Sequence, residues 1–286
     1  MFLSDQWTDY AILDAGGGEK YERWGDVTLL RPDPQAAWPM AAPARVDARY
    51  IRSATGGGHW EYARELPPSW HIRYGELTFI VRPTGFKHTG LFPEQAVNWD
   101  FMRGVVQAHN KDTGRPFRAL NLFGYTGGAT CALAAAGAAV AHVDAAKGMV
   151  SWAKDNLACC GLSDRPVRFL VDDAMKFALR EARRGNVYDG ILMDPPSYGR
   201  GPSGEMWKIE ENLYPLVAAC ADILSESARF FLINSYTTGL APSVLSNVLR
   251  VALKARGGRV ETDEVGLPIR RDGLVLPCGA TARWTR

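Results

Sequence analysis

A chain of 286 residues with 47% hydrophobic and 22% charged residues has the balance of an ordinary globular protein, which excludes disordered and fibrous classes. Its length fits one large domain or a core domain with a smaller one attached. The formal net charge of +2 gives the whole chain no strong field for nucleic acid, and no run approaches the roughly 18 apolar residues of a membrane span. The start, Met1 to Asp5, lacks a charged region followed by an apolar one, so we expect a cytoplasmic protein.

The first 85 residues predict a small β-rich domain. Residues 10–31 alternate apolar and polar positions around the turn Gly16 to Gly18, which indicates an antiparallel hairpin. More short strand-like segments follow between Gly and Pro positions, at Ala48–Ser53, Gly58–Tyr62, Trp70–Tyr74 and Leu77–Arg82. Several tryptophans crowd into this region. They indicate a small core, and an exposed subset would also be able to stack on bases.

A Gly- and Pro-containing segment, residues 85–95, joins this region to a predicted helix over residues 95–111. Its polar side chains stand beside glycines just ahead of the main domain, where the backbone can approach a ligand closely. We therefore predict that the segment lines a cofactor pocket. The side chains expected to do so are Lys87, His88, Thr89, Phe92 and Gln95.

From Arg118 onwards strands alternate with helices, which predicts a mostly parallel sheet covered on both faces. We expect strands at Arg118–Phe123, Ala139–Asp144, Val167–Val171, Tyr188–Asp194 and Arg229–Asn234. Helices are expected at Gly128–Ala136, Ala146–Cys160, Asp173–Arg184, Ile209–Ser225 and Ala241–Lys254, with two last strands at Arg259–Leu267 and Leu276–Trp284. Five βα units closed by a hairpin differ from the two equal halves of a dehydrogenase. They predict an α/β fold with a seven-stranded Rossmann-like methyltransferase sheet whose last strand is antiparallel, over residues 86–286.

The first of these strands ends in a glycine turn, Phe123 to Gly128. Such a turn lets the backbone approach a ligand, and the helix that follows offers free N–H groups. The turn lacks the G-x-G-x-x-G spacing that seats the pyrophosphate of a dinucleotide. It suits instead an amino-acid group, such as the carboxylate and amine of S-adenosylmethionine. The predicted contacts are Phe123, Gly124, Tyr125, Thr126 and Gly127.

Carboxylates stand at the ends of the next two strands, the edge where open sheets bind ligands. Asp144, followed by Ala145, can accept both ribose hydroxyls of a nucleoside, and the same position would serve NAD. Asp172 and Asp173 precede Ala174 and a helix, where an acid or its neighbouring N–H can read an adenine edge. Asp173 is equally suited to be an N-cap alone.

Together with Asp194 to Tyr198 after the fourth strand, these segments resemble the class I S-adenosylmethionine-dependent methyltransferases. The likeness is specifically to the ribosomal RNA large-subunit branch, with its N-L-F-x-Y-T-G-G, V-D, D-D-A and D-P-P motifs in order over residues 85–286. The resemblance implies that residues 124–127 hold the methionine part of the cofactor, Asp144 the ribose and Asp173 the adenine. It also implies that residues 87–95 form the segment covering the cofactor.

The Asp-Pro-Pro-Ser-Tyr stretch is the predicted catalytic site. Asp194 and the carbonyl of Pro195 are acceptors held by rigid prolines, Pro196 included, and they can grip an amino group while Tyr198 stacks on a flat ring. This suits methylation of an exocyclic base nitrogen, whose attack must be aligned with the S–CH₃ bond. The alternative interpretation is that the two prolines only end the strand and begin a loop, with no role in catalysis.

Methylation of a cytosine carbon would require a cysteine nucleophile in the site. None of the five cysteines lies in Asp194 to Ser197 or in Ile233 to Tyr236, so a nitrogen is preferred. The glycine-rich segment 199–208 is expected to be mobile and to close over a flipped-out nucleotide. Its substrate contacts are predicted to be Arg200, Trp207 and Lys208, with Asn234 as a further polar contact or a loop cap.

The distribution of charge is uneven, since residues 241–286 carry eight Arg or Lys against four Asp or Glu. Residues with such an excess of positive charge usually form a solvated face, and they are also suited to contact phosphates. The leading hypothesis is an RNA methyltransferase that uses S-adenosylmethionine, acts on ribosomal RNA at a base nitrogen and needs no metal. The alternatives are a methyltransferase acting on a protein amide or a small molecule, and a non-catalytic RNA-binding module. Neither the target nucleotide nor the oligomeric state follows from the sequence.

Overall fold

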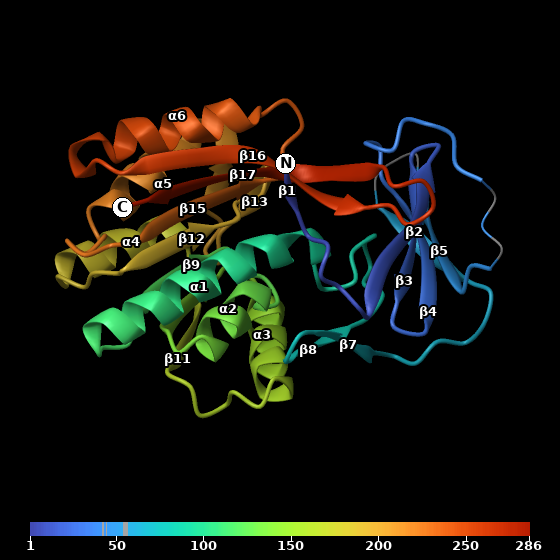
Figure 1. Cartoon of the computed structure of the whole chain (residues 1–286), viewed down its shortest axis with the longest axis horizontal. Coiled ribbons are helices and arrows are strands. Elements are labelled where there is room, and N and C mark those ends of the chain that lie inside the picture. Colours follow the sequence, from blue (N-terminus) through green and yellow to red (C-terminus); the bar gives the residue numbers. More distant parts are fainter. Residues whose placement is uncertain (42, 44, 54–56) are drawn as a thin grey trace. The chain divides into compact units, whose positions relative to one another are not determined.

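The computed structural model shown in Figure 1 describes residues 1–41, 43, 45–53 and 57–286. The chain forms two compact units. The N-terminal unit consists of Met1–Val97 with Val265–Cys278, and the C-terminal unit of Asn98–Glu264 with Gly279–Arg286. The predicted division into a β-rich domain of residues 1–85 and a methyltransferase domain of residues 86–286 stays a prediction. None of the helices in the described part of the chain is both long and apolar enough to cross a membrane.

The N-terminal unit is β-rich, as the alternating pattern predicted. A five-stranded sheet with the order β2-β3-β4-β5-β6 is built from β2 (Tyr10–Gly16), β3 (Glu19–Trp24), β4 (Val27–Pro32), β5 (Ala48–Arg52) and β6 (Gly58–Tyr62). A separate hairpin pairs β7 (Trp70–Tyr74) with β8 (Leu77–Val81). Trp7 and Trp24 are buried, which confirms the core interpretation for these two tryptophans.

A buried charge network crosses the larger sheet of this unit. Glu22, which is fully buried, accepts hydrogen bonds from Arg31 Nε at 2.6 Å and from the Tyr10 hydroxyl at 2.7 Å. Burial acts to raise the pKa of the Glu22 carboxyl, but the charges of Arg31 and Lys20 and the hydrogen bonds from Arg31 and Tyr10 together hold that pKa below its usual value. Removing either partner would therefore leave an uncompensated charge in the interior.

The C-terminal unit is built on the predicted sheet. Its strand order is β16-β17-β15-β12-β9-β10-β11, and β17 runs antiparallel to β15 while β15, β12, β9, β10 and β11 are parallel. The strands are β9 (Arg118–Leu122), β10 (Ala139–Asp144), β11 (Val167–Val171), β12 (Gly190–Met193), β15 (Phe230–Ser235), β16 (Arg259–Pro268) and β17 (Val275–Thr285). The seven-stranded arrangement with a reversed last strand is thus confirmed.

One strand of this sheet escaped the sequence analysis. The two-residue β1 (Phe2–Leu3) pairs in parallel with β16 at Val265 and Gly266, so the complete sheet has eight strands. A strand of two residues carries no periodicity that could have revealed it.

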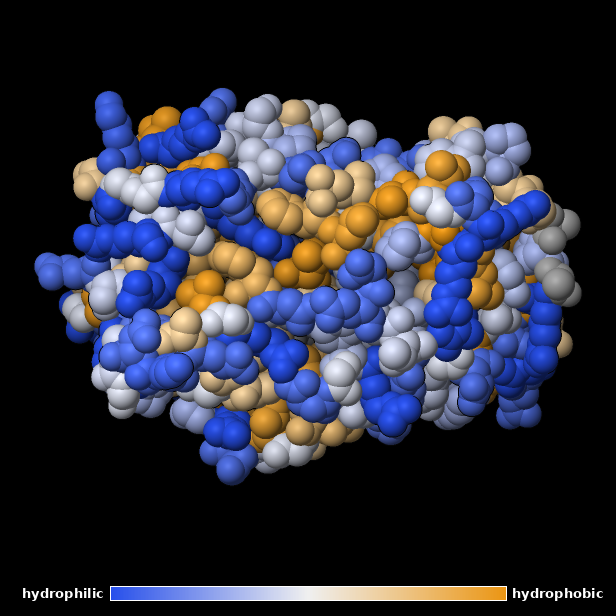
Figure 2. Space-filling view, in the orientation of Figure 1, coloured by the Kyte–Doolittle hydropathy of each residue, from blue (hydrophilic) through white to orange (hydrophobic). Residues whose placement is uncertain are grey.

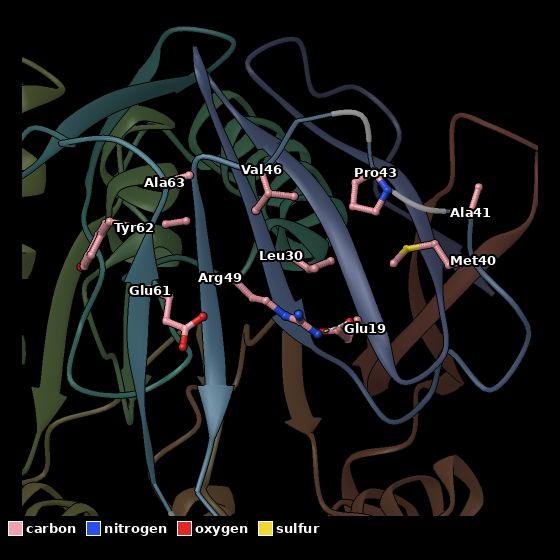
Figure 3. Close-up of a pocket in the computed structure, with 11 residues that line it drawn as sticks. Glu19, Leu30, Met40, Ala41, Pro43, Val46, Arg49, Glu61, Tyr62 and Ala63 are labelled. Carbon is pink, nitrogen blue, oxygen red and sulfur yellow. Dashed lines mark hydrogen bonds and ion pairs between the residues drawn. The ribbon is translucent and has the colours of Figure 1, made fainter.

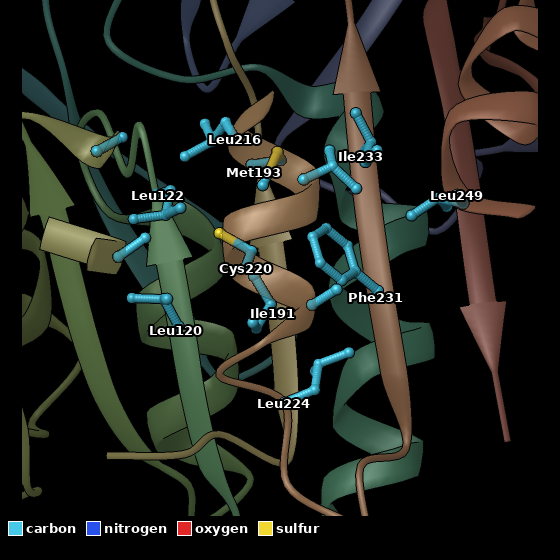
Figure 4. Packing of buried hydrophobic residues seen from close by; sticks show 14 of the residues in the cluster. Leu120, Leu122, Ile191, Met193, Leu216, Cys220, Leu224, Phe231, Ile233 and Leu249 are labelled. Carbon is cyan, nitrogen blue, oxygen red and sulfur yellow. The ribbon is translucent and has the colours of Figure 1, made fainter. Parts of the chain in front are cut away.

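Helices cover both faces of the sheet (Figure 1). They are α1 (Ala96–Thr113), α2 (Gly128–Ala135), α3 (Lys147–Cys159), α4 (Ala174–Arg183), α5 (Ile209–Ala221) and α6 (Pro242–Ala252), with the short η2 (Lys254–Arg256) after α6; η1 (Pro93–Gln95) belongs to the N-terminal unit. Figure 4 shows apolar side chains of β9, β12 and β15 meeting α5, among them Leu122, Met193 and Phe231 against Leu216 and Cys220. This core fixes the ends of the parallel strands, where the predicted site residues lie.

The glycine-rich segment 199–208 contains a hairpin of β13 (Tyr198–Arg200) and β14 (Met206–Lys208), which the sequence analysis did not predict. Its turn is closed by a hydrogen bond of 2.8 Å from the Gly201 N–H to the Glu205 carbonyl, and Gly204 adopts the left-handed conformation with φ 92° that a tight turn requires. The glycines therefore shape a turn, and the mobility of the segment stays a prediction.

Candidate active site at the carboxyl edge of the sheet

The glycine turn joins β9 to α2 in a strained conformation. Phe123 and Tyr125 have φ of 55° and 50°, values that side chains other than glycine rarely adopt. Gly127 is also left-handed, at φ 83°, and its N–H donates to the carbonyl of Gly124 at 3.0 Å. Left-handed non-glycine residues cluster at ligand sites, where the surrounding structure holds them in place.

A buried polar group supports this turn from below. The Thr130 hydroxyl is 2.9 Å from His142 Nδ1 and accepts a hydrogen bond of 2.9 Å from Asn121 Nδ2. All three side chains are buried, and burial lowers the pKa of His142 to about 4, so the imidazole is neutral. A Cβ on Gly124 would lie 2.4 Å from His142 Cε1, so any larger residue there would force the ring or the turn to shift. The sequence analysis missed this group, although polar residues inside two buried strands were its signal.

The helix α3 holds the other side of the turn. Asn156 is buried, and its Nδ2 donates to the carbonyl of Thr126 at 2.7 Å. A Cβ on Gly127 would come within 2.8 Å of the Ala153 Cβ, so the turn and α3 are in close contact. The backbone of residues 124–127 is consequently fixed before any ligand arrives.

Asp144 lies beside the glycine turn, at the end of β10. Its Oδ2 accepts the Tyr125 N–H and its Oδ1 accepts the Ala146 N–H, both at 2.8 Å, so the carboxylate spans the turn and the start of α3 across Ala145. Burial raises the pKa of Asp144 from its usual value, and the two N–H groups act in the opposite direction. Each oxygen keeps a second lone pair with which it can accept a hydroxyl.

The two acids after β11 have different partners. Asp173 is the N-cap of α4, and its Oδ1 accepts the Lys176 N–H at 2.8 Å. Asp172 uses Oδ1 for the Asp173 N–H and Oδ2 for an ion pair with Arg180. The Asp172 N–H donates to the Asp144 carbonyl at 3.1 Å, which brings the ends of β10 and β11 together. Asp173 therefore does cap α4, which was one of its two expected roles, and the next residue, Ala174, is buried.

Asp194 follows β12 directly, and its N–H donates to the Leu122 carbonyl at 3.4 Å, next to the glycine turn. The adjacent prolines are fixed by the hairpin, because Trp207 Nε1 donates to the Pro196 carbonyl at 2.6 Å while Pro195 is buried. The Trp207 ring packs 5.0 Å from the Phe123 ring, so the hairpin is attached to the turn. Tyr198 is 55% exposed at the rim.

The predicted substrate contacts are not all equivalent. Arg200 and Lys208 are exposed on the hairpin, where Lys208 pairs with Glu211 at 2.8 Å. Asn234 is only 3% exposed, and its side-chain oxygen accepts a hydrogen bond of 3.0 Å from Asn98 on α1. The role of Asn234 toward a substrate stays a prediction, and its observed contact is internal.

The predicted cofactor-lining segment belongs to the N-terminal unit. The hydroxyl of Thr89 is buried and has no hydrogen-bond partner among the described residues. The His88 ring lies 5.3 Å from the Phe92 ring, and burial lowers the pKa of His88 to about 4 and that of Lys87 to about 8. Gln95 is buried. His88 is therefore neutral at pH 7, which together with the buried Thr89 and Gln95 is compatible with a lining role, whereas Lys87 is still mostly charged at pH 7 and donates to the Pro32 carbonyl at 3.2 Å.

A cavity of about 680 Å³ also lies in the N-terminal unit (Figure 3). Leu30 and Met40 line it, and an ion pair between Glu19 and Arg49 at 3.0 Å lies along its wall. None of the predicted site residues lines this cavity, so its size does not make it the cofactor site. Among the described residues no group of three or more His, Cys, Asp or Glu side chains is arranged to hold a metal ion.

Comparison with known proteins gives the chemistry of this fold. Residues 40–212 match the family of S-adenosylmethionine-dependent methyltransferases. The crystal structure of such a methyltransferase from Agrobacterium tumefaciens is 36% identical, with a TM-score of 0.94, and the match covers 99% of this chain and 92% of that one.

Curated relatives point to a narrower activity of their own. The ribosomal RNA large subunit methyltransferase K/L of Shewanella baltica (strain OS195) is 32% identical over 55% of this chain and 21% of its own length. The protein of the same name from Syntrophotalea carbinolica is 27% identical over 65% of this chain and 25% of its own length. The matched part thus spans about a fifth to a quarter of these relatives.

Proposed function

The chain belongs to the family of S-adenosylmethionine-dependent methyltransferases, and we propose that it methylates a base nitrogen in RNA, with ribosomal RNA as the substrate. The large-subunit methyltransferases among its relatives support RNA, and such a substrate would place its action in the cytoplasm.

The glycine turn and its neighbours fit the cofactor. The fixed backbone of residues 124–127 is suited to the amino-acid end of S-adenosylmethionine, and the spare lone pairs of Asp144 to its ribose hydroxyls. Asp173 keeps one carboxylate oxygen beyond its N-cap bond, which suits the adenine amino group. That Lys87, His88, Thr89, Phe92 and Gln95 also contact the cofactor stays part of the proposal, and the Thr89 hydroxyl, which has no hydrogen-bond partner among the described residues, is suited to a polar ligand.

The chemistry asks little of the protein beyond alignment. The bound cofactor supplies an activated methyl group, so the chain must present a nucleophilic nitrogen in line with it and exclude water. Asp194 and the Pro195 carbonyl would accept the two hydrogens of an exocyclic amino group and direct its lone pair. Tyr198, exposed at the rim, would stack on the base.

The single observation that supports this proposal most is the position of Asp194. Its backbone is hydrogen-bonded to Leu122, one residue before the glycine turn, and the following prolines are held by Trp207. An acceptor is therefore fixed next to the predicted methyl donor, as alignment requires. No cysteine stands in residues 194–198 or 233–236, which supports nitrogen over a cytosine carbon.

The test combines Asp194→Asn with methylation of in vitro transcribed large-subunit ribosomal RNA, read as modified nucleosides by mass spectrometry. We expect Asp194→Asn to bind S-adenosylmethionine in calorimetry and to lose methyl transfer at least about 100-fold, as is usual for a positioned catalytic group. The exposed Asp164→Asn is the control and should behave as wild type. Transfer to protein instead of RNA, or full activity of Asp194→Asn, would contradict the proposal.

A further inference from the structure

A second cavity, of about 470 Å³, lies within the C-terminal unit, between the end of α6, η2 and the first residues of β16. Leu249 and Leu253 form part of its lining, and Trp284 of β17 forms another part. Trp284 pairs with Phe231 near the start of β15, so the cavity lies at the amino edge of the sheet. The predicted methyl-transfer site lies at the opposite, carboxyl edge.

The charged side chains lining this cavity all carry the same sign. They are Arg250, Lys254 and Arg259, and no acidic residue lines it. Arg250 and Lys254 form no ion pair with any residue that the structure describes, whereas Arg259 pairs with Glu261 at 2.5 Å. Figure 2 shows strongly hydrophilic side chains gathered over the region of α6 and the C-terminus. The cavity therefore has an uncompensated positive potential that favours an anion.

The backbone of the cavity is held in place by a fourth cation, Arg256. Its guanidinium donates to the carbonyls of Ser225, Ala221 and Leu224, each at 2.9 Å, and so anchors η2 to the end of α5. Trp284 Nε1 donates to the Gly257 carbonyl at 2.7 Å. Arg256 is thus used for structure, and the other three cations are left to face the cavity.

The turn after η2 is equally constrained. Gly258 is left-handed at φ 86°, and a Cβ there would lie 2.4 Å from the Thr285 carbonyl. Glycine is required at this point, so the two flanking cations, Lys254 and Arg259, are presented from a rigid turn. The side chains of both cations are exposed, so the fixed backbone limits only the space that they sample before they bind an anion.

We propose that this cavity binds the phosphate backbone of the RNA substrate, at a distance from the nucleotide that is methylated. The proposal rests on the proposed function. RNA is favoured over an acidic protein because a nucleic acid supplies one negative charge at every nucleotide, and guanidinium groups can bind its phosphate oxygens bidentately. A folded ribosomal RNA is large enough to contact both edges of the sheet, so the cavity would orient the substrate while the carboxyl edge selects the base.

The test removes the three cations together, as Arg250→Ala, Lys254→Ala and Arg259→Ala in the full chain. The probe is unmodified large-subunit ribosomal RNA transcribed in vitro, and its affinity is measured between 50 and 200 mM salt. We expect weaker binding and a slope of log affinity against log salt that is shallower by about 2 to 3, since three phosphate contacts contribute about 0.7 to 0.9 each. The affinity for S-adenosylmethionine should stay unchanged.

The control is a charge-matched triple variant of exposed cations in the same unit, Lys111→Ala, Arg165→Ala and Arg183→Ala. It should retain both the affinity and the slope of wild type. Equal losses in the two triple variants, or wild-type RNA affinity in the cavity variant, would overturn the inference. If wild type methylates this RNA, such results leave the proposed function intact. Failure of wild type itself to methylate RNA would refute the proposed function instead.

Discussion

The contact between Gly124 and His142 provides the sharpest test of the predicted cofactor turn. In Gly124→Ala the new Cβ would lie 2.4 Å from His142 Cε1 and 2.5 Å from Nδ1. His142 cannot move aside easily, because its ring is fully buried and bonded to Thr130. Gly124 itself does not have a positive φ, so the perturbation is purely steric.

Overpacking of this kind costs about 1–3 kcal/mol. If the turn yields rather than the ring, most of this cost appears in binding, and the dissociation constant for S-adenosylmethionine rises about 10- to 100-fold, at 1.4 kcal/mol per factor of ten. If the ring yields, the free energy of unfolding falls by a similar amount. Calorimetric titration with the cofactor and denaturant unfolding of the same samples separate the two outcomes.

A double-mutant cycle isolates the contact. In the His142→Ala background the space for the Cβ exists, so Gly124→Ala should lose most of its effect. Gly148→Ala is the matched control, since a Cβ there meets nothing within 4 Å and α3 should gain about 0.5–1 kcal/mol. Wild-type binding and stability in Gly124→Ala, or the same loss in both backgrounds, would refute the reasoning.

Three further predictions follow from buried ionisable groups. Asp144→Asn should weaken S-adenosylmethionine binding at least about tenfold in calorimetry, because charged hydrogen bonds are lost. Since burial raises the pKa of Asp144, the affinity of wild type should begin to fall at a higher pH than it would if this aspartate had its usual pKa. His142 stays neutral in the folded chain down to about pH 4, whereas in the unfolded chain it is protonated below about pH 6.5. The free energy of unfolding should therefore fall on acidification through this window, by up to about 3 kcal/mol. Between pH 7.5 and pH 5 the free energy of unfolding of His142→Gln should change less than that of wild type. Glu22→Gln should destabilise the N-terminal unit by about 3–5 kcal/mol, because Arg31 is left buried without its counter-charge, and hydrogen exchange of β2 to β4 should report it; unaltered exchange would contradict this.

Most of the parallel strands could be predicted because they are short apolar runs that stop at a Gly or Asp. The strand predicted at Ala139–Asp144 appears with those ends, and the strand predicted at Arg118–Phe123 ends one residue earlier, at Leu122. The hairpin of β13 and β14 was not predicted, since its stability comes from a tertiary contact, Trp207 against Phe123, that no local pattern encodes.

The second layer of the site was hidden for a related reason. Asn121 and His142 look like single polar exceptions in buried strands, and only the fold shows that they share the Thr130 hydroxyl. Likewise the sequence could not distinguish Arg250 and Lys254, which form no ion pair with any described residue, from Arg256, whose guanidinium donates to carbonyls at the end of α5. The number of charged residues follows from the sequence, but the structure is needed to identify which of them already have a partner within the protein.

The small net charge of the chain therefore conceals an ordered separation of charge within the C-terminal unit. Acids at or just after the ends of parallel strands, Asp144, Asp173 and Asp194, lie at the carboxyl edge and suit a cofactor with hydroxyl, amino and sulfonium groups. The cavity with Arg250 and Lys254 lies at the amino edge and suits phosphates. The carboxylates repel the phosphate backbone of an RNA, so a base can enter the site only if attraction elsewhere on the protein offsets this repulsion. Basic residues placed away from the acids supply that attraction without neutralising the groups that grip the cofactor.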